Sequence, residues 1–267
     1  MFLTPRWLAS HVFVIALVAA FVAAGLWQID RLQDRQATNE RVAGRMGEVW
    51  LLSDLLAQGL APDEYEFRRV QLTGTFDDSR QILIANRSDE GAPGFWVWTA
   101  FTPEGESVSE SVVVVNRGFV PRSVGVGLSD GLSIAEVAST AGLVTIEGLL
   151  RLGDLDARVS EDGTQLTRPD TDTAVEVLGV ESALDSGLYL ALEAQEPLRV
   201  EELPRPIPRP DLGEGPHRSY AFQWFTFATI GVVGYSLLLR RISRGDQSRG
   251  DVPVADTPNQ PRRDTDG

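Results

Sequence analysis

Two long apolar segments, one near each end of the chain, constrain the fold more than any other feature of the sequence. Residues 7–27 are apolar except for Ser10 and His11, and residues 221–239 hold only a few scattered polar side chains. A bilayer core requires about 20 predominantly apolar residues in a helix. The sequence therefore predicts two transmembrane helices, at residues 11–29 and 217–240.

The positively charged residues beside these segments predict their orientation. Arg6 precedes the first span, and four arginines follow the second: Arg240, Arg241, Arg244 and Arg249. Loops rich in Lys and Arg stay on the cytoplasmic side, and interfacial Trp and Tyr lie at the headgroups. Trp27 closes the first span, while Tyr220 and Trp224 open the second. We expect a two-pass membrane protein with residues 1–10 and 241–267 in the cytoplasm and residues 30–216 outside it.

A cleaved signal peptide is the alternative interpretation of the N-terminus, because Val22-Ala23-Ala24 resembles a small-residue cleavage site. The apolar stretch is long for a signal peptide, and Trp27 follows it as an interfacial anchor would. A retained membrane span is the favoured prediction.

Each span also has a face of small residues. On the first they lie four apart and lead to a glutamine: Ala16, Ala20, Ala24 and Gln28. On the second the face extends back to His217: Ala221, Trp224, Ala228 and Gly231. Small residues at this spacing let helices approach closely. The two faces either meet each other or a partner's helices, or they only reflect a high alanine content.

The segment between the spans is acidic and long enough for one domain. Residues 28–217 hold 33 acidic residues and 16 arginines, a net charge of −17. Apolar periodicity and β-branched runs predict strands at 67–76, 81–86, 95–101, 111–120, 142–151 and 187–194. A helix is expected at 47–60, and short helices capped by Ser133 with Glu136 and by Thr173 with Glu176. The expected fold is a β-rich α+β extracytoplasmic domain flanked by two transmembrane helices.

Three further segments of this region carry predictions. The Gly-rich residues 125–131 are expected to be a turn-rich connector. The proline-rich residues 204–210 can only be extended, which makes them a stiff spacer back to the membrane. Residues 241–267 are expected to be a disordered tail.

Composition excludes several functions. The chain has no cysteine, two histidines and two methionines, so disulfides, thiolate catalysis, Cys-ligated metals and copper delivery are excluded. The net charge of −14 argues against nucleic-acid binding. The external domain lacks the histidine that a Ser-His-Asp hydrolase needs. We therefore predict neither an enzyme nor a structural metal site.

His217 is the one chemically reactive side chain in a distinctive place. An imidazole at the membrane surface can be an axial ligand of haem iron, and the adjacent Arg218 can pair with propionates. The alternative is an interfacial histidine that only hydrates at the headgroups.

A succession of short motifs resembles the Surfeit-locus family of cytochrome c oxidase assembly factors. These motifs are Gly25-Leu26-Trp27-Gln28-Ile29-Asp30-Arg31-Leu32, Phe67-Arg68-Arg69-Val70, Val113-Val114-Val115-Asn116-Arg117-Gly118-Phe119-Val120-Pro121, Glu147-Gly148-Leu149-Leu150-Arg151 and His217-Arg218-Ser219-Tyr220-Ala221-Phe222-Gln223-Trp224. Phe119 stands where the family usually has Trp, and Arg218 where it usually has an apolar residue. The motifs follow one another in the family's order.

The resemblance implies a bacterial plasma-membrane factor that matures oxidase subunit I when haem a enters. It implies a transient haem a site with His217 as the iron ligand. The candidate site residues are His217, Arg218, Tyr220, Trp224, Trp27 and Gln28. Subunit I, haem a synthase and membrane lipids are the expected partners. A scaffold for subunit I that binds no haem is the alternative function. For Asn116-Arg117-Gly118 we favour a fold-maintaining role at the end of a buried strand.

Overall fold

The structure is a computed structural model that describes residues 4–105, 112–129, 137–181, 184, 187–199 and 202–250. The chain divides into two compact units. Residues 1–37 and 213–267 form the helical unit, and residues 38–212 form the barrel unit. The division at residues 37 and 38 lies eight residues after the boundary expected at residues 29 and 30, and the division at residues 212 and 213 lies four residues before the boundary expected at 216 and 217.

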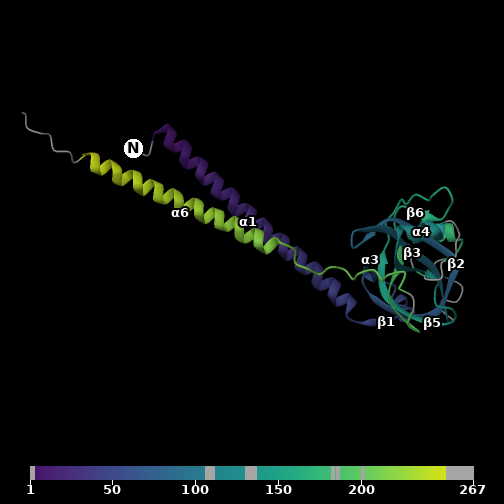
Figure 1. Cartoon of the computed structure of the whole chain (residues 1–267). Helices are drawn as coiled ribbons and strands as arrows, with labels where there is room; N and C mark the ends of the chain where they lie inside the picture. The colour runs from purple at the N-terminus through teal and green to yellow at the C-terminus, as the bar shows by residue number, and fades with distance from the viewer. Residues whose placement is uncertain are drawn as a thin grey trace, which may run out of the picture. The chain divides into compact units, whose positions relative to one another are not determined.

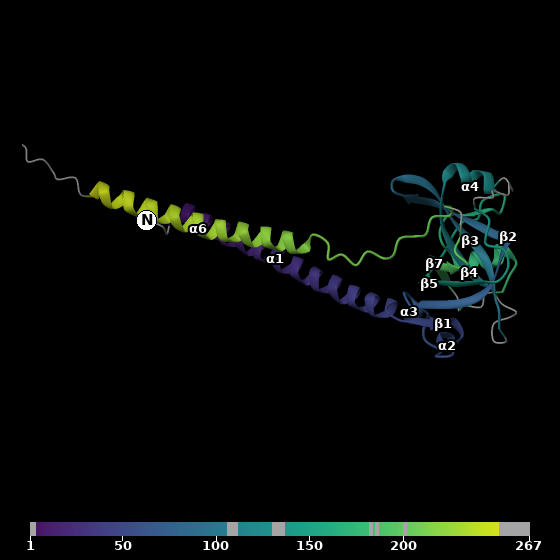
Figure 2. The same ribbon diagram turned by 60° about the horizontal axis from the view of Figure 1, so that its bottom comes forward.

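Two long helices make up the described part of the helical unit. Helix α1 runs over Pro5–Met46 and α6 over His217–Gly250, and the two lie side by side in both views (Figures 1 and 2). Both are long and apolar enough to cross a membrane. Helix α1 continues well past the expected end of the first span at residue 29. Helix α6 starts at the expected residue and continues beyond residue 240, while residues 251–267 lie outside the described part.

The barrel unit is built on one sheet that closes on itself. Its main strands are β2 (Arg69–Asp89), β3 (Ala92–Pro103), β4 (Val113–Pro121), β5 (Val144–Leu152) and β7 (Leu188–Glu196). They pair in the order β2-β3-β4-β7-β5, and the first residues of β2 pair with β5. Only β4 and β7 are parallel among these pairs. The predicted strands 67–76 and 81–86 are thus one strand with a bulge between Asp77 and Gln81.

The core fills the inside of this closed sheet. Buried aliphatic and aromatic side chains from all five strands meet in one cluster: Val70, Leu72, Phe101, Val113, Val115, Val144, Ile146, Leu150, Leu188, Leu190 and Leu192. The alternate residues of the same strands point to the other face. There Trp98 packs on Tyr189 with ring centroids 4.6 Å apart. Burial raises the pKa of Tyr189, although Arg151 and Arg87 oppose the shift.

Two short elements cover that second face. Strand β6 (Gln165–Leu166) pairs with β2, and helix α5 (Thr171–Leu178) packs Ala174 into the cluster around Trp98. The cap of α5 differs from the prediction. Asp170, not Thr173, is the N-cap, and its carboxylate accepts a hydrogen bond from Thr173 N. Burial alone raises the pKa of Asp170, but hydrogen bonds from Ala157 N and from Thr173 outweigh it and lower the pKa.

Two further predictions of local structure are wrong. Residues 47–60 are not one helix: β1 (Val49–Leu51) pairs in parallel with β2, and α2 (Leu52–Leu56) and α3 (Pro62–Tyr65) follow. The glycine-rich segment that we expected to be a connector is largely helix α4 (Arg122–Ser129). The predicted cap at Ser133 with Glu136 lies outside the described residues.

The Asn116-Arg117-Gly118 motif lies inside β4 and not at its end. Val97 pairs with Gly118 and Trp98 with Asn116, so Arg117 is an extra residue in a bulge. Its guanidinium is buried, with Nη2 2.6 Å from the carbonyl oxygen of Val137 and Nη1 3.2 Å from Asp78 Oδ1. The side-chain oxygen of Asn116 accepts a hydrogen bond from Gly118 N. These contacts serve the fold, as expected for this motif.

The proline-rich segment is extended but not free of the domain. Arg205 forms a two-way backbone bridge with Phe119, at 2.7 and 2.8 Å. Further along, Arg209 pairs with Glu193 of β7 at 2.6 Å. The segment is therefore attached to the barrel at two points. The side-chain amide of Asn39 donates to the carbonyl oxygen of Leu212, 2.6 Å away, so the two ends of the barrel unit meet.

Candidate functional site

The two helices of the helical unit pack through one face of each. On α1 this face holds Val18, Phe21 and Gly25. Phe21 stacks on Trp224, with ring centroids 5.8 Å apart. Gly25 is buried, and a Cβ there would lie 2.8 Å from the ring of Phe225. The absence of a side chain at Gly25 thus lets α6 approach closely.

The small-residue faces expected from the sequence take unequal parts in this packing. On α6, Ala221 and Ala228 are buried, and Gly231 faces Val18 of α1. On α1, Ala16 and Ala20 are exposed. The face predicted for α6 is therefore in the helix contact. The face of α1 that contacts α6 is rotated away from Ala16 and Ala20, while Ala24 and Gln28 of the predicted row are half-buried.

Changing Gly25 to leucine should separate the helices. Overpacking costs about 1–3 kcal/mol, so the helix contact should weaken about tenfold. The chain has no cysteine, which allows one engineered pair to report on the contact. Val18→Cys with Gly231→Cys suits this purpose, because a Cβ at Gly231 lies 3.3 Å from Val18. Disulfide yield should fall in the Gly25→Leu background. Gly234→Leu is the control, since nothing lies within 4 Å of a Cβ there. Equal yields in both would contradict the packing.

The start of α6 is fixed by contacts along α1. Arg35 Nε donates to the carbonyl oxygen of Gly213, 3.2 Å away, and the amide of Gln36 donates to Glu214 Oε1 at 2.6 Å. Gly215 then takes a positive φ of 70°, and Pro216 O accepts hydrogen bonds from Ser219 Oγ and Tyr220 N. These contacts hold the residue that follows, His217, against α1.

His217 and Gln28 form the central pair of the candidate site. His217 Nδ1 lies 2.9 Å from Gln28 Oε1. A carbonyl oxygen only accepts hydrogen bonds, so this contact fits the neutral tautomer in which Nδ1 carries the proton and Nε2 the lone pair. Nε2 makes no hydrogen bond to the described part of the chain. A Cβ on Gly215 would lie 3.6 Å from Nε2. The glycine therefore leaves room beside the nitrogen that could bind a metal.

The other four predicted site residues do not gather around this pair through specific contacts. Trp27 and Tyr220 are 61% and 47% exposed, and Arg218 is exposed as well. Trp224 faces the middle of the helix pair, between Phe21 and Phe227. The structure thus joins two of the six candidates directly. The exposed three are free to contact a ligand or lipid.

A second polar cluster at the other end of the helix pair was missed by the sequence analysis. The hydroxyl of Tyr235 lies 2.8 Å from His11 Nδ1 and 3.1 Å from Ser10 Oγ. The rings of His11 and Tyr235 meet edge to face, with centroids 5.7 Å apart. Ser10 and His11 stood out as polar residues in an apolar span. Their partner could have been sought among the hydroxyl-bearing residues near the far end of the second span, where Tyr235 lies.

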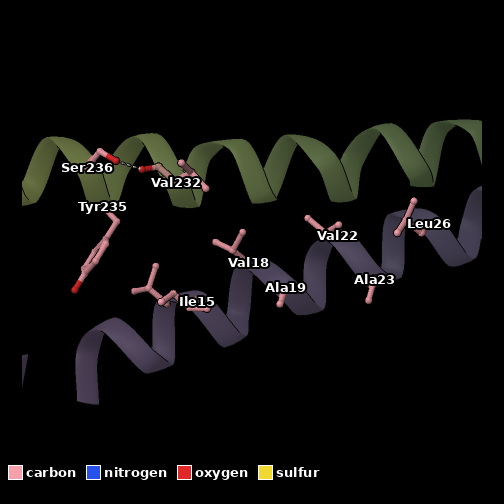
Figure 3. A pocket seen from close by; sticks show the side chains of 10 residues that line it. Ile15, Val18, Ala19, Val22, Ala23, Leu26, Val232, Tyr235 and Ser236 are labelled. Atoms are coloured by element: carbon pink, nitrogen blue, oxygen red, sulfur yellow. Dashed lines mark hydrogen bonds between the residues drawn. The ribbon is translucent and has the colours of Figure 1, made fainter. Parts of the chain in front are cut away.

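An apolar groove lies between the two clusters, beside the helix contact (Figure 3). It has a volume of about 540 Å³. Its α1 wall extends from Val14 to Leu26, and its α6 wall is made by Val232, Tyr235 and Ser236. Figure 3 shows Tyr235 reaching from α6 toward α1. The lining on α1 includes the small side chains of Ala19 and Ala23.

The described part of the barrel unit shows no comparable chemistry. No group of three or more His, Asp or Glu side chains within the described residues is arranged to hold a metal ion. Some of its charged side chains form pairs that join strands, such as Arg69 with Glu147 and Glu193 at 2.7 and 3.0 Å. The end of the helical unit that holds His217 and Gln28 is therefore the best candidate for a functional site.

Known proteins resemble the chain over most of its length. A model of the SURF1 family matches residues 15–229. Uncharacterized SURF1-like proteins of Mycobacterium bovis and Mycobacterium tuberculosis are each 29% identical to the chain over 238 residues, covering 87% of this chain and 83% of theirs. Surfeit locus protein 1 of Arabidopsis thaliana is 36% identical over 108 residues, which is 37% of this chain and 30% of that protein. The family match includes both Gln28 and His217.

Proposed function

The chain belongs to the SURF1 family of cytochrome oxidase assembly factors, and we propose that it serves subunit I of the oxidase at the stage when haem a enters. The family is one of assembly factors and not of enzymes. The proposal is that the chain holds haem a transiently and presents it to subunit I, with haem a synthase as a further partner.

The proposal includes a two-pass arrangement in the bacterial plasma membrane. Residues 11–29 of α1 and 217–240 of α6 would cross the bilayer, with the barrel unit outside the cytoplasm. Arg6, Arg240 and Arg241 support this orientation, because arginines flank spans on the cytoplasmic side. The His217–Gln28 pair would then lie at the outer membrane surface, close to the exposed ring of Trp27.

The observation that carries the proposal is the hydrogen bond between His217 and Gln28. A histidine that binds metal through one ring nitrogen almost always donates a hydrogen bond from the other. Here Gln28 Oε1 is placed to accept that bond from Nδ1, which would leave the lone pair on Nε2. The room left at Gly215 gives a metal access to Nε2. The residues present therefore fit an axial ligand of haem iron.

Three exposed residues would complete the site. The guanidinium of Arg218 would pair with propionate carboxylates, a contact strengthened by charge. Trp27 and Tyr220 would provide apolar ring surface for the porphyrin edge at the membrane surface, where both side chains are exposed. When bound, the haem would supply an iron that takes a nitrogen ligand, and a hydrophobic macrocycle. The chain's own part is to bind, to orient and to shield it from water.

Deleting the gene should lower oxidase activity and the haem a absorption of membranes together. A chain that delivers haem a would also carry a haem band when purified from haem a-producing cells. A scaffold that binds no haem would co-purify with subunit I without pigment, and this result would favour the alternative function. Normal activity and a normal haem a spectrum in the deletion strain, with no paralogue present, would contradict both functions.

A further inference from the structure

We infer that the groove between α1 and α6 receives the farnesyl tail of haem a while His217 faces the iron. This inference rests on the proposed function and extends it from the porphyrin to the tail. Haem a differs from protohaem in carrying this long isoprenoid chain, and a carrier of haem a has to accommodate it.

The lining of the groove suits a hydrocarbon chain. Between Val14 and Leu26 it consists of aliphatic and alanine side chains, with Val232 opposite. The hydroxyl of Ser236 is turned back to the carbonyl oxygen of Val232, 2.7 Å away, and the hydroxyl of Tyr235 bonds to His11 and Ser10. The polar atoms near the groove are thus engaged with the protein. The lining therefore favours an apolar ligand over a polar one.

The groove is long enough for a hydrocarbon chain but too small for a partner helix. Twelve residues separate Val14 from Leu26, which corresponds to about 18 Å along a helix. At the Val14 end, the side chain of Tyr235 reaches toward α1 (Figure 3). Its hydroxyl lies within hydrogen-bonding distance of His11 and Ser10 there. A helix has a diameter of about 10 Å with its side chains, which a groove of about 540 Å³ cannot enclose over this length.

The other end of the groove reaches the level of the proposed haem site. Leu26 lies two residues before Gln28, and Gln28 holds His217. Two residues correspond to about 3 Å of rise along a helix. A ligand whose iron is bound by His217 can therefore place an attached chain in the groove without leaving the helix pair.

Titration of the full-length chain in phosphatidylcholine nanodiscs tests the inference. The ligands are protohaem, which lacks the tail, and haem a and haem o, which carry it. Moving the tail from the bilayer into the groove changes little in polarity. The gain in binding free energy therefore comes from van der Waals packing and not from hydrophobic burial. We expect the two tailed haems to bind about tenfold more tightly, which is less than the roughly 10²- to 10⁴-fold gain that a full second contact gives. Equal affinities would overturn the inference and leave the haem function standing.

Filling the groove provides the matched comparison. Ala19→Leu adds bulk to the groove wall, while Ala20→Leu adds the same bulk to an exposed position outside it. The first variant should lose the preference for tailed haems and keep its affinity for protohaem, and the second should behave as the wild type. Loss of the preference in both variants, or in neither, would contradict the groove as the binding place.

A photoactivatable farnesyl probe without any haem tests binding of the tail independently of iron binding. It should label residues 14–26 in the wild type and in His217→Ala, and labelling should fall in Ala19→Leu. Competition by phosphatidylcholine as strong as by farnesol would identify a lipid acyl chain as the occupant and overturn the inference. Failure of all haems to bind while the probe still labels the groove would refute the proposed function and, with it, the role of the groove in haem a binding.

Discussion

Replacing His217 with alanine is expected to remove the haem band from the purified chain. The chain has two histidines, and His217 is the one at this end of the helix pair, since His11 lies at the opposite end. Without it, no nitrogen ligand remains at the site for the iron. Absorption of the purified protein per mole of chain measures the loss. Free imidazole should restore part of the band in His217→Ala, because the space of the missing ring can accept it.

Two variants of Gln28 separate positioning from binding. Gln28→Leu removes the acceptor of the Nδ1 proton, and loss of such a partner typically lowers metal affinity about 10- to 100-fold. Gln28→Glu keeps an acceptor oxygen and should retain most of the affinity.

A band of unchanged intensity and position in His217→Ala would show that His217 is not the ligand. Equal behaviour of the two Gln28 variants would show that the hydrogen bond has no role.

A valine in place of Gly118 is expected to destabilise the barrel unit strongly. A Cβ at this position would lie 2.1 Å from the carbonyl oxygen of Arg205, a backbone atom that cannot simply turn away. The φ of 128° also suits only glycine and costs other residues about 1–3 kcal/mol. The two backbone hydrogen bonds between Phe119 and Arg205 should break as well, at about 0.5–1.5 kcal/mol each. Chemical unfolding of the full chain in detergent measures the change.

Gly163→Ala is the control for backbone strain alone. Gly163 also has a positive φ, of 72°, but nothing lies within 4 Å of a Cβ there. This variant should lose only about 1 kcal/mol, the cost of the left-handed conformation for alanine. The difference between the two variants then measures the contact with the proline-rich segment. A Gly118→Val protein as stable as Gly163→Ala would show that the segment is not held where the structure has it.

The strands of the barrel could be predicted because their signal is local. The run Val112-Val113-Val114-Val115 is β-branched throughout, and the structure buries all four of its side chains. The pairing of strands could not be predicted. Strand β1 follows α1 directly and contains only three residues, and it exists through pairing with Arg69–Gln71 about 20 residues away. A leucine spacing that also fits a helix led to the wrong prediction for residues 47–60.

In the candidate site, too, the residues could be predicted from the sequence but the contact between them could not. Gln28 and His217 were each singled out by their place beside a span and by resemblance to the family. Their hydrogen bond joins residues 189 positions apart, which no local pattern reports. The packing face of α1 was misplaced because small residues were weighed and large aromatics were not. Phe21 and Trp224 stack across the helix contact, in which Gly25 lies against Phe225.

The bond between Asn39 and Leu212 has a consequence for how the chain is assembled from modules. The barrel unit begins and ends at one place, which is the arrangement found where one domain is inserted into another. Formally, the protein is a helical hairpin whose connecting loop has been replaced by a barrel. Exchange of the barrel for a short loop would therefore preserve the hairpin's connectivity. Such a minimal hairpin would retain Gln28, His217 and the groove, and it would reveal whether the barrel contributes to ligand handling or only to the choice of partner.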